Sequence, residues 1–226
     1  MKQSDIGLSG DVRQIKSRER VSNHGEVFTA EREVNAMLDL VRQETERIDS
    51  RFLEPACGNG NFLANILRRK LAVVRANYAA SRPAYELNAL IALSSLYGIE
   101  LLEDNVSECR ERLYRQFVDE YGSLFSPDGQ TPDYLSSIRY LLDRNIILGD
   151  ALTLMTPDES RPIVFSEWSA INYQIKRRDF TLDMLLRNQP IAAPNLFSDL
   201  GDEAFIPTPF AEYPMKHYSQ IYRHDS

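Results

Sequence analysis

Residues 53–63 read Leu-Glu-Pro-Ala-Cys-Gly-Asn-Gly-Asn-Phe-Leu, and this stretch predicts more about the fold than any other part of the chain. An apolar and aromatic lead-in ends on an acid, Glu54, and a proline; a turn of small residues follows, and a helix is predicted from about Asn61. Gly58 and Gly60 allow backbone dihedrals and a close approach that a side chain would forbid. The pattern is typical of a tight strand-to-helix turn on whose backbone a ligand can lie.

The charges around this turn suit a ligand that carries both signs. Backbone amides at the start of the following helix favour a negative group such as a carboxylate. Glu54, at the end of the strand, is placed to meet a cationic ammonium. One site that receives both groups suits the amino-acid end of S-adenosylmethionine. The alternative is that the glycines serve helix packing alone and that the turn binds no ligand.

At this point the chain resembles the adenine-specific DNA methyltransferases of restriction-modification systems. In that family the turn is typically written D/E-P-A-C/M-G-x-G-x-F/L, and the residues from Glu54 to Phe62 match it at every defined position. The resemblance implies a Rossmann-like methyltransferase fold with a parallel-sheet core. It also implies that S-adenosylmethionine binds at Glu54, Ala56, Gly58 and Gly60.

Three further segments are similar to motifs of the same family and follow in the family's order. The sequence Gly-Glu-Val-Phe-Thr ends in Phe28 and Thr29, and in the family this aromatic-threonine pair lines the cofactor pocket. Tyr-Gly-Ile-Glu ends on Glu100 and resembles the second strand, whose acid binds the ribose hydroxyls. Asn-Ile-Ile-Leu-Gly-Asp-Ala-Leu contains Asp150 and resembles the third strand, whose aspartate meets the adenine amine.

The resemblance ends where the target base should bind. These enzymes carry an Asn/Asp-Pro-Pro-Tyr/Phe sequence after the fourth strand, which accepts hydrogen bonds from the target amine and stacks on the flipped base. Here the candidate fourth strand, Pro162–Phe165, runs into Ser-Glu-Trp-Ser at 166–169, and the chain contains no Pro-Pro pair. No catalytic residue is therefore assigned.

Size and composition set the class of protein. With 226 residues the chain can bury one good core, or one core with an appendage. A net charge of −7 argues against a DNA footprint over the whole surface, although the basic clusters at 13–20 and 176–178 can either meet phosphate or be solvated patches. No apolar run approaches the ~20 residues of a membrane span. Two cysteines, Cys57 and Cys109, form no pairing pattern, which favours a reduced cytoplasm. No metal-ligand spacing is present.

Alternating strands and helices predict a parallel sheet with helices on its faces. In such a sheet ligands bind at the carboxyl ends of the strands, where Glu54, Glu100 and Asp150 all fall. Each acid alone has a simpler interpretation as a turn or cap residue. Four strands are predicted, fewer than the seven or so that the family implies, and they end near residues 54, 101, 148 and 165.

The chain is expected to divide into three parts. Residues 1–20 form a polar N-terminal segment, 21–187 the S-adenosylmethionine-binding domain, and 188–226 a tail rich in proline and aromatic residues without a strand pattern. After Ser169 one helix is predicted, from Phe180 to Leu186. The half-sheet would leave an exposed edge, and the tail would either cover it or dock on a second protein.

Three functions fit these observations. The first is a cofactor-binding component of a DNA adenine methyltransferase in a restriction-modification or phage-defence system. A second subunit would supply its catalytic loop and DNA recognition. The second is an autonomous enzyme with a divergent loop at 166–169, in which Trp168 would stack on the base. The third is a catalytically silent methyltransferase-like module that serves interaction or regulation.

Overall fold

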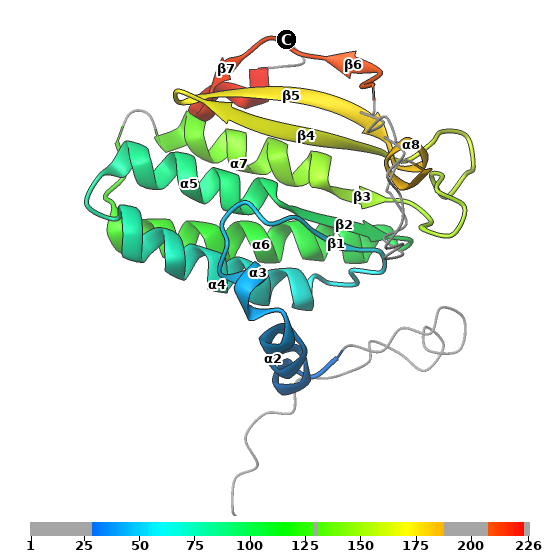
Figure 1. Ribbon diagram of the computed structural model, residues 1–226, viewed down its shortest axis with the longest axis horizontal. Coiled ribbons are helices and arrows are strands. Elements are labelled where there is room, and N and C mark those ends of the chain that lie inside the picture. The colour runs from blue at the N-terminus through cyan, green and yellow to red at the C-terminus, as the bar shows by residue number, and fades with distance from the viewer. Residues whose placement is uncertain (1–28, 129–130, 188–207, 224–226) are drawn as a thin grey trace, which may run out of the picture.

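Three parallel strands form the centre of the fold: β1 (Phe52–Glu54), β2 (Leu96–Glu100) and β3 (Ile146–Leu148), in the spatial order β1-β2-β3 (Figure 1). The computed structural model describes residues 29–128, 131–187 and 208–223. All five residues of β2 are buried, as expected for the central strand of a covered sheet. The first three predicted strands are thereby confirmed, and the alternation of strands and helices gives a mixed α/β fold.

Two helices connect each pair of neighbouring strands. Helices α4 (Asn61–Tyr78) and α5 (Arg82–Ser94) join β1 to β2, whereas α6 (Glu103–Leu124) and α7 (Thr131–Asn145) join β2 to β3. Helices α4 and α6 contact each other and β2, and α5 and α7 lie between that layer and a second sheet (Figure 1). None of the helices in the described ranges is both long and apolar enough to cross a membrane.

The helices follow from apolar residues at helical spacing. In α4 the buried positions recur every three or four residues, which places one face of the helix in the core. The buried apolar residues are Leu63, Ile66, Leu67, Leu71 and Val74. Before β1, α2 (Glu31–Leu40) and α3 (Arg42–Thr45) pack against α4. Asp39 of α2 also pairs with Arg69 of α4 at 2.7 Å.

The predicted fourth strand is wrong in extent and in pairing. Strand β4 runs from Val164 to Ile171 and forms an antiparallel hairpin with β5 (Gln174–Thr181), in a sheet separate from the parallel one. The turn between them places Asn172 at φ 48° and Tyr173 at φ 64°, as two-residue hairpin turns require. Tyrosine is an uncommon residue at such a position, so the sequence carries little sign of this turn.

The elements predicted after residue 169 are also corrected. The helix expected over 180–186 is α8 (Leu182–Arg187), because Phe180 and Thr181 belong to β5. The tail does contain strands: β6 (Ala211–Glu212) and β7 (Lys216–His217) both pair with β5. The 3-10 helix η1 (Tyr218–Arg223) then packs on α7.

The described part of the tail therefore covers a strand edge within the same chain, but the edge is that of β5 and not of the parallel sheet. Among the residues that the structure describes, β1 pairs with β2 alone. The expectations for 1–28 and for 188–207 concern residues outside the described ranges.

Candidate functional site

The turn between β1 and α4, residues 55–60, is here called the glycine turn, and it adopts the conformation that its sequence predicts. Gly58 has φ 52° and Gly60 has φ 82°, both in the left-handed region that favours glycine. The amide of Cys57 donates to the carbonyl of Ile99 at 2.9 Å, so the turn lies directly against the end of β2. Helix α4 begins at the next residue, Asn61, as predicted.

Packing also explains why glycine is needed at two positions here, without any ligand. A Cβ added at Gly60 would lie 2.5 Å from Sγ of Cys109, and one added at Gly98 would lie 2.8 Å from Sγ of Cys57. Both cysteines are buried. A hydrogen bond with Cys109 and burial raise the pKa of the Cys57 thiol, so this thiol is not a ready nucleophile.

The predicted acids meet at one edge of the sheet. The register places Glu54 opposite Gly98 and Glu100 opposite Leu148. The amide of Gly149 donates to the carbonyl of Glu100 at 2.9 Å, which ties the end of β3 to the end of β2. The carboxyl ends of the three strands therefore lie side by side, which is the juxtaposition that the sequence predicts.

The acids are not equally available to a ligand. Glu54 is half-buried, and this burial raises the pKa of its carboxyl, while a hydrogen bond from the Ala56 amide lowers it. Asp150 is also half-buried, and its Oδ1 accepts the amide of Leu152 at 2.8 Å. Ala56 is exposed. Part of this edge is therefore open to solvent.

Glu100 is engaged within the protein. Its side chain is buried, and its two oxygens accept the amide of Gly58 at 2.8 Å and the amide of Leu102 at 3.0 Å. Hydrogen bonds from backbone amides to a carboxylate are among the stronger ones in proteins. Glu100 thus fixes the conformation of the glycine turn, a role that the sequence alone did not reveal.

The segment before α2 reaches the same turn. The side-chain amide of Asn61 donates to the carbonyl of Thr29 at 2.6 Å, which brings Thr29 to the start of α4. Thr29 does not cap the following helix, because the N-cap of α2 is Ala30. Phe28, the other predicted residue of this segment, lies outside the described ranges.

Asn59 is a site residue that the sequence did not single out. It stands between the two glycines of the turn, and its amide nitrogen donates to Glu108 at 3.0 Å. Its Oδ1 is buried and accepts no hydrogen bond from the described residues. An orphaned buried acceptor is rare, and here it is an atom that a bound donor group could satisfy.

The prediction that residues 166–169 form a loop is wrong. These residues lie within β4, and Ser166 is buried, donating to Asp179 at 2.7 Å. The indole of Trp168 donates to Oδ1 of Asn145 at 2.9 Å and meets the Tyr140 ring edge-on. Because Asn145 precedes β3, Trp168 lies at the opposite end of the strands from the acids.

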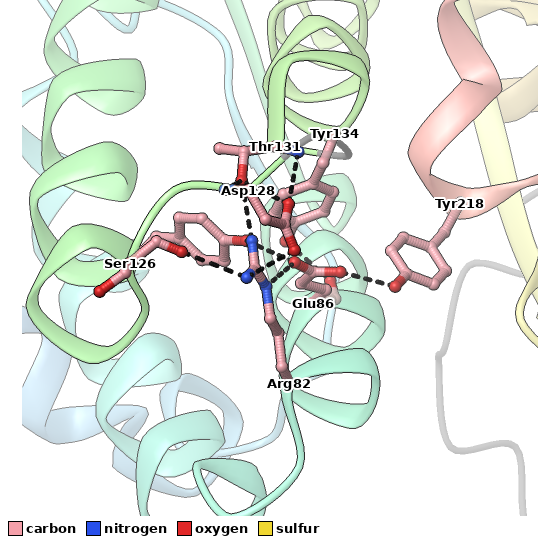
Figure 2. Close-up of polar contacts among 8 residues, drawn as sticks. Arg82, Glu86, Ser126, Asp128, Thr131, Tyr134 and Tyr218 are labelled. Carbon is pink, nitrogen blue, oxygen red and sulfur yellow. Dashed lines mark hydrogen bonds and ion pairs between the residues drawn. The ribbon is translucent and has the colours of Figure 1, made fainter.

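A buried carboxylate elsewhere forms a network that joins the helices to the tail (Figure 2). Glu86 of α5 pairs with Arg82 at 2.9 Å and accepts a hydrogen bond from Tyr218 at 2.6 Å. Tyr121 also donates to this carboxylate, and Tyr134 donates to the Glu86 backbone at 2.8 Å. With its oxygens bonded in this way, Glu86 fastens η1 to α5 and is not a candidate catalytic acid.

A cavity of about 460 Å³ lies away from the turn, between the β4–β5 hairpin and the end of α7. None of the predicted cofactor residues within the described ranges lines it. We place the candidate cofactor site at the turn, because the strand ends, the acids and the glycines meet there. Comparison of the chain with protein-family models, with curated proteins and with solved structures found no match.

Proposed function

We propose that the chain is the cofactor-binding part of a DNA adenine methyltransferase and that S-adenosylmethionine binds at the glycine turn. The observation that carries this proposal is the meeting of Glu54, Glu100 and Asp150 with the turn at the carboxyl edge of one parallel sheet. This edge is where open α/β sheets bind ligands. Thr29 reaches the same place through Asn61.

The residues present fit the parts of this cofactor. The half-buried carboxylate of Glu54 would meet the ammonium, and the amides at the start of α4 would meet the carboxylate. Asp150 would accept from the adenine amine. Glu100 already accepts the backbone amides of Gly58 and Leu102 and, at 3.5 Å, the side-chain amide of Asn105. A carboxylate has about four lone-pair positions, so one position is left for a ribose hydroxyl. When bound, this cofactor supplies an activated methyl group.

A second subunit would complete the enzyme. No described residue stands in the place of the base-binding loop, since 166–169 lie within β4. In the described ranges β1 has β2 as its only paired strand, and Leu53 of β1 is 44% exposed. We place the second subunit's strands along β1, with its catalytic loop and DNA recognition beside the turn. DNA would bind through this complex, in a restriction-modification or phage-defence system of the cytoplasm.

A catalytically silent module is the second candidate. It is favoured because contacts within the protein already account for three of the site residues. Gly60 packs on Cys109 and Gly98 packs on Cys57, while Glu100 holds the turn by accepting the amide of Gly58. In that case the fold serves interaction or regulation, and the acids at the strand ends meet no cofactor.

Calorimetric titration of the full chain with S-adenosylmethionine separates the two candidates. We expect micromolar binding, weakened at least tenfold in Glu54→Gln, because the variant keeps the shape of the side chain and removes the charge that meets the ammonium. Glu111→Gln is the matched control, since Glu111 lies on the surface of α6 and pairs with Arg115. Absence of binding would favour the silent module. Transfer of the methyl group to DNA by this chain alone would contradict the need for a second subunit.

The pH dependence of binding gives a second test of Glu54. Because burial raises the pKa of this carboxyl, acidification should neutralise it at a higher pH than an exposed glutamate. Affinity for S-adenosylmethionine should therefore fall as the pH is lowered towards that raised pKa. In Glu54→Gln this part of the pH dependence should be lost.

A further inference from the structure

The cavity beside the hairpin is large enough for a small organic ligand. Its volume of about 460 Å³ lies within the range of roughly 300 to 1,000 Å³ that such sites occupy. One wall is the inner face of β4 and β5, and the other is the end of α7 with Ile147 of β3. Nothing in the proposed cofactor site uses it.

The charges that line the cavity favour an anion. Three guanidiniums, of Arg144, Arg161 and Arg177, stand against the two carboxylates of Asp143 and Asp179. Both carboxylates already have partners. Asp179 lies 2.5 Å from Arg177 in a pair that is almost fully buried, and Asp143 lies 3.3 Å from Arg110.

Arg161 is the guanidinium best placed to receive a ligand. It is exposed, and among the residues that the structure describes its side chain has no hydrogen-bond or ion-pair partner. Its backbone is nevertheless fixed: its carbonyl accepts the amide of Thr156 at 2.8 Å, and its own amide donates to Oγ1 of the same threonine at 3.2 Å. Thr156 and Thr181 add hydroxyl groups to the lining.

Apart from Ser166, the remaining described lining is apolar. Ile147, Ile163 and Val164 contribute aliphatic surface, and Phe210 contributes a ring that is 57% exposed. A flat exposed ring beside aliphatic side chains suits the face of a planar aromatic group. The cavity therefore combines a cationic end, a hydroxyl group at Thr181 and an apolar, aromatic side. The Thr156 hydroxyl already donates to Asp158 at 2.5 Å.

We propose that this cavity binds a nucleoside phosphate, with its phosphate on Arg161 and its base between Phe210 and the aliphatic wall. A guanidinium matches the geometry of phosphate oxygens, and a base stacks on an aromatic ring without regard to its identity. The nucleotide is either free in solution or an unpaired nucleotide of a DNA strand. This site is separate from the proposed cofactor site and does not depend on it.

Titration of the full chain with adenosine 5′-monophosphate tests the proposal. We expect saturable binding, weakened at least tenfold in Arg161→Gln, which removes a guanidinium that has no hydrogen-bond or ion-pair partner within the described ranges. Arg115→Gln is the matched control and should leave the affinity unchanged, because Arg115 is exposed on α6 and pairs with Glu111. Val164→Trp narrows the cavity and should also abolish binding, provided that its circular dichroism matches that of the wild type.

The comparison probes define the ligand. Adenosine without phosphate and inorganic phosphate alone should each bind more weakly than the nucleotide. In one outcome, a short single-stranded DNA binds while the mononucleotide does not. If Arg161→Gln weakens that binding, the site is supported and its nucleotide belongs to a DNA strand. The proposal is overturned if neither probe binds. It is also overturned if a probe binds Arg161→Gln with unchanged affinity, since the nucleotide would then lie elsewhere, for example at the glycine turn.

Discussion

The parallel-sheet region and the hairpin region of this molecule are held together by different interactions. Residues 52–148 bury apolar side chains at helical spacing against a short sheet. Residues 164–187 and 208–223 instead include a buried ion pair, Arg177 with Asp179, on the inner face of a hairpin. Arg177 also donates to Tyr140 of α7, so this pair joins the hairpin to the helices. The pattern of hydrophobic residues in the sequence does not predict a buried charge pair of this kind.

The largest effect is expected from breaking the buried pair. Arg177→Met leaves the carboxylate of Asp179 buried without its cation, which should lower the free energy of unfolding by about 3–5 kcal/mol. The neighbouring Lys176→Met is the matched control: Lys176 pairs with Glu212 at 2.6 Å, but both side chains are well exposed. That change should cost less than about 1 kcal/mol. Urea unfolding at neutral pH measures both.

Equal costs for the two variants would contradict the comparison. The hairpin region would then be stabilised by its apolar contacts, as the parallel-sheet region is. A much larger cost for Arg177→Met would confirm that the two regions depend on different interactions.

The parallel-sheet region can be broken at the glycine turn. Gly60→Ala places a side chain at φ 82° and against Sγ of Cys109, and should cost about 2–4 kcal/mol. Gly122→Ala is the control within α6, where an added Cβ meets nothing within 4 Å. It should stabilise the chain by about 0.5 kcal/mol, because alanine favours a helix. Thermal unfolding of the two variants should therefore shift in opposite directions, and shifts of the same sign would contradict this account.

The sequence predicts the parallel-sheet region better than it predicts the hairpin region. The glycine turn, the three parallel strands and the meeting of Glu54, Glu100 and Asp150 were predicted, because local turn chemistry and periodicity specify them. Strand β5 was missed because its sequence, Gln-Ile-Lys-Arg-Arg-Asp-Phe-Thr, places charged residues at buried positions. Their burial is possible because Arg177 and Asp179 pair with each other on one face of the strand, and charged residues at alternate positions give no sign that this face is buried.

The candidate site shows the same limit at the level of single residues. The sequence predicted which residues gather at the strand ends. It did not predict that Glu100 would hold the turn by accepting the amides of Gly58 and Leu102, nor that Asn59 would bury an unsatisfied oxygen. These contacts depend on distances between segments that only the folded chain sets.

A buried lysine adds a pH test inside the parallel-sheet region. Lys70 of α4 is fully buried and donates to the carbonyl of Ile48 at 3.1 Å and to Oγ of Ser95 at 2.5 Å. Burial lowers the pKa of this amine to about 7, from 10.5 in the unfolded chain. Above pH 7 the unfolded chain therefore holds a proton that the folded chain has released.

The free energy of unfolding should consequently rise as the pH is raised from 7 towards 10.5, and this dependence should level off below the folded pKa, where both states hold the proton. One pH unit within this window corresponds to about 1.4 kcal/mol, so the gain between pH 7 and 8.5 should approach roughly 2 kcal/mol. Lys70→Met should remove this rise. Parallel urea titrations of both proteins measure it, and equal slopes would show that Lys70 keeps an ordinary pKa.

The smallest effect is expected at Glu100, where the fold and the candidate site meet. Glu100→Gln keeps one acceptor oxygen and turns an NH₂ group towards an amide that needs an acceptor, so it should cost about 1–2 kcal/mol of stability. Glu103→Gln, an exposed acid in the first turn of α6, should cost less than about 0.5 kcal/mol. If the two costs are equal, Glu100 does not hold the turn, and its carboxylate is free for a ligand. If Glu100→Gln costs more than Glu103→Gln, a loss of S-adenosylmethionine binding in Glu100→Gln has two possible causes, a disturbed turn and a lost contact with the ribose. The charge of Glu54, which lies outside this contact, is then the sharper probe of the cofactor.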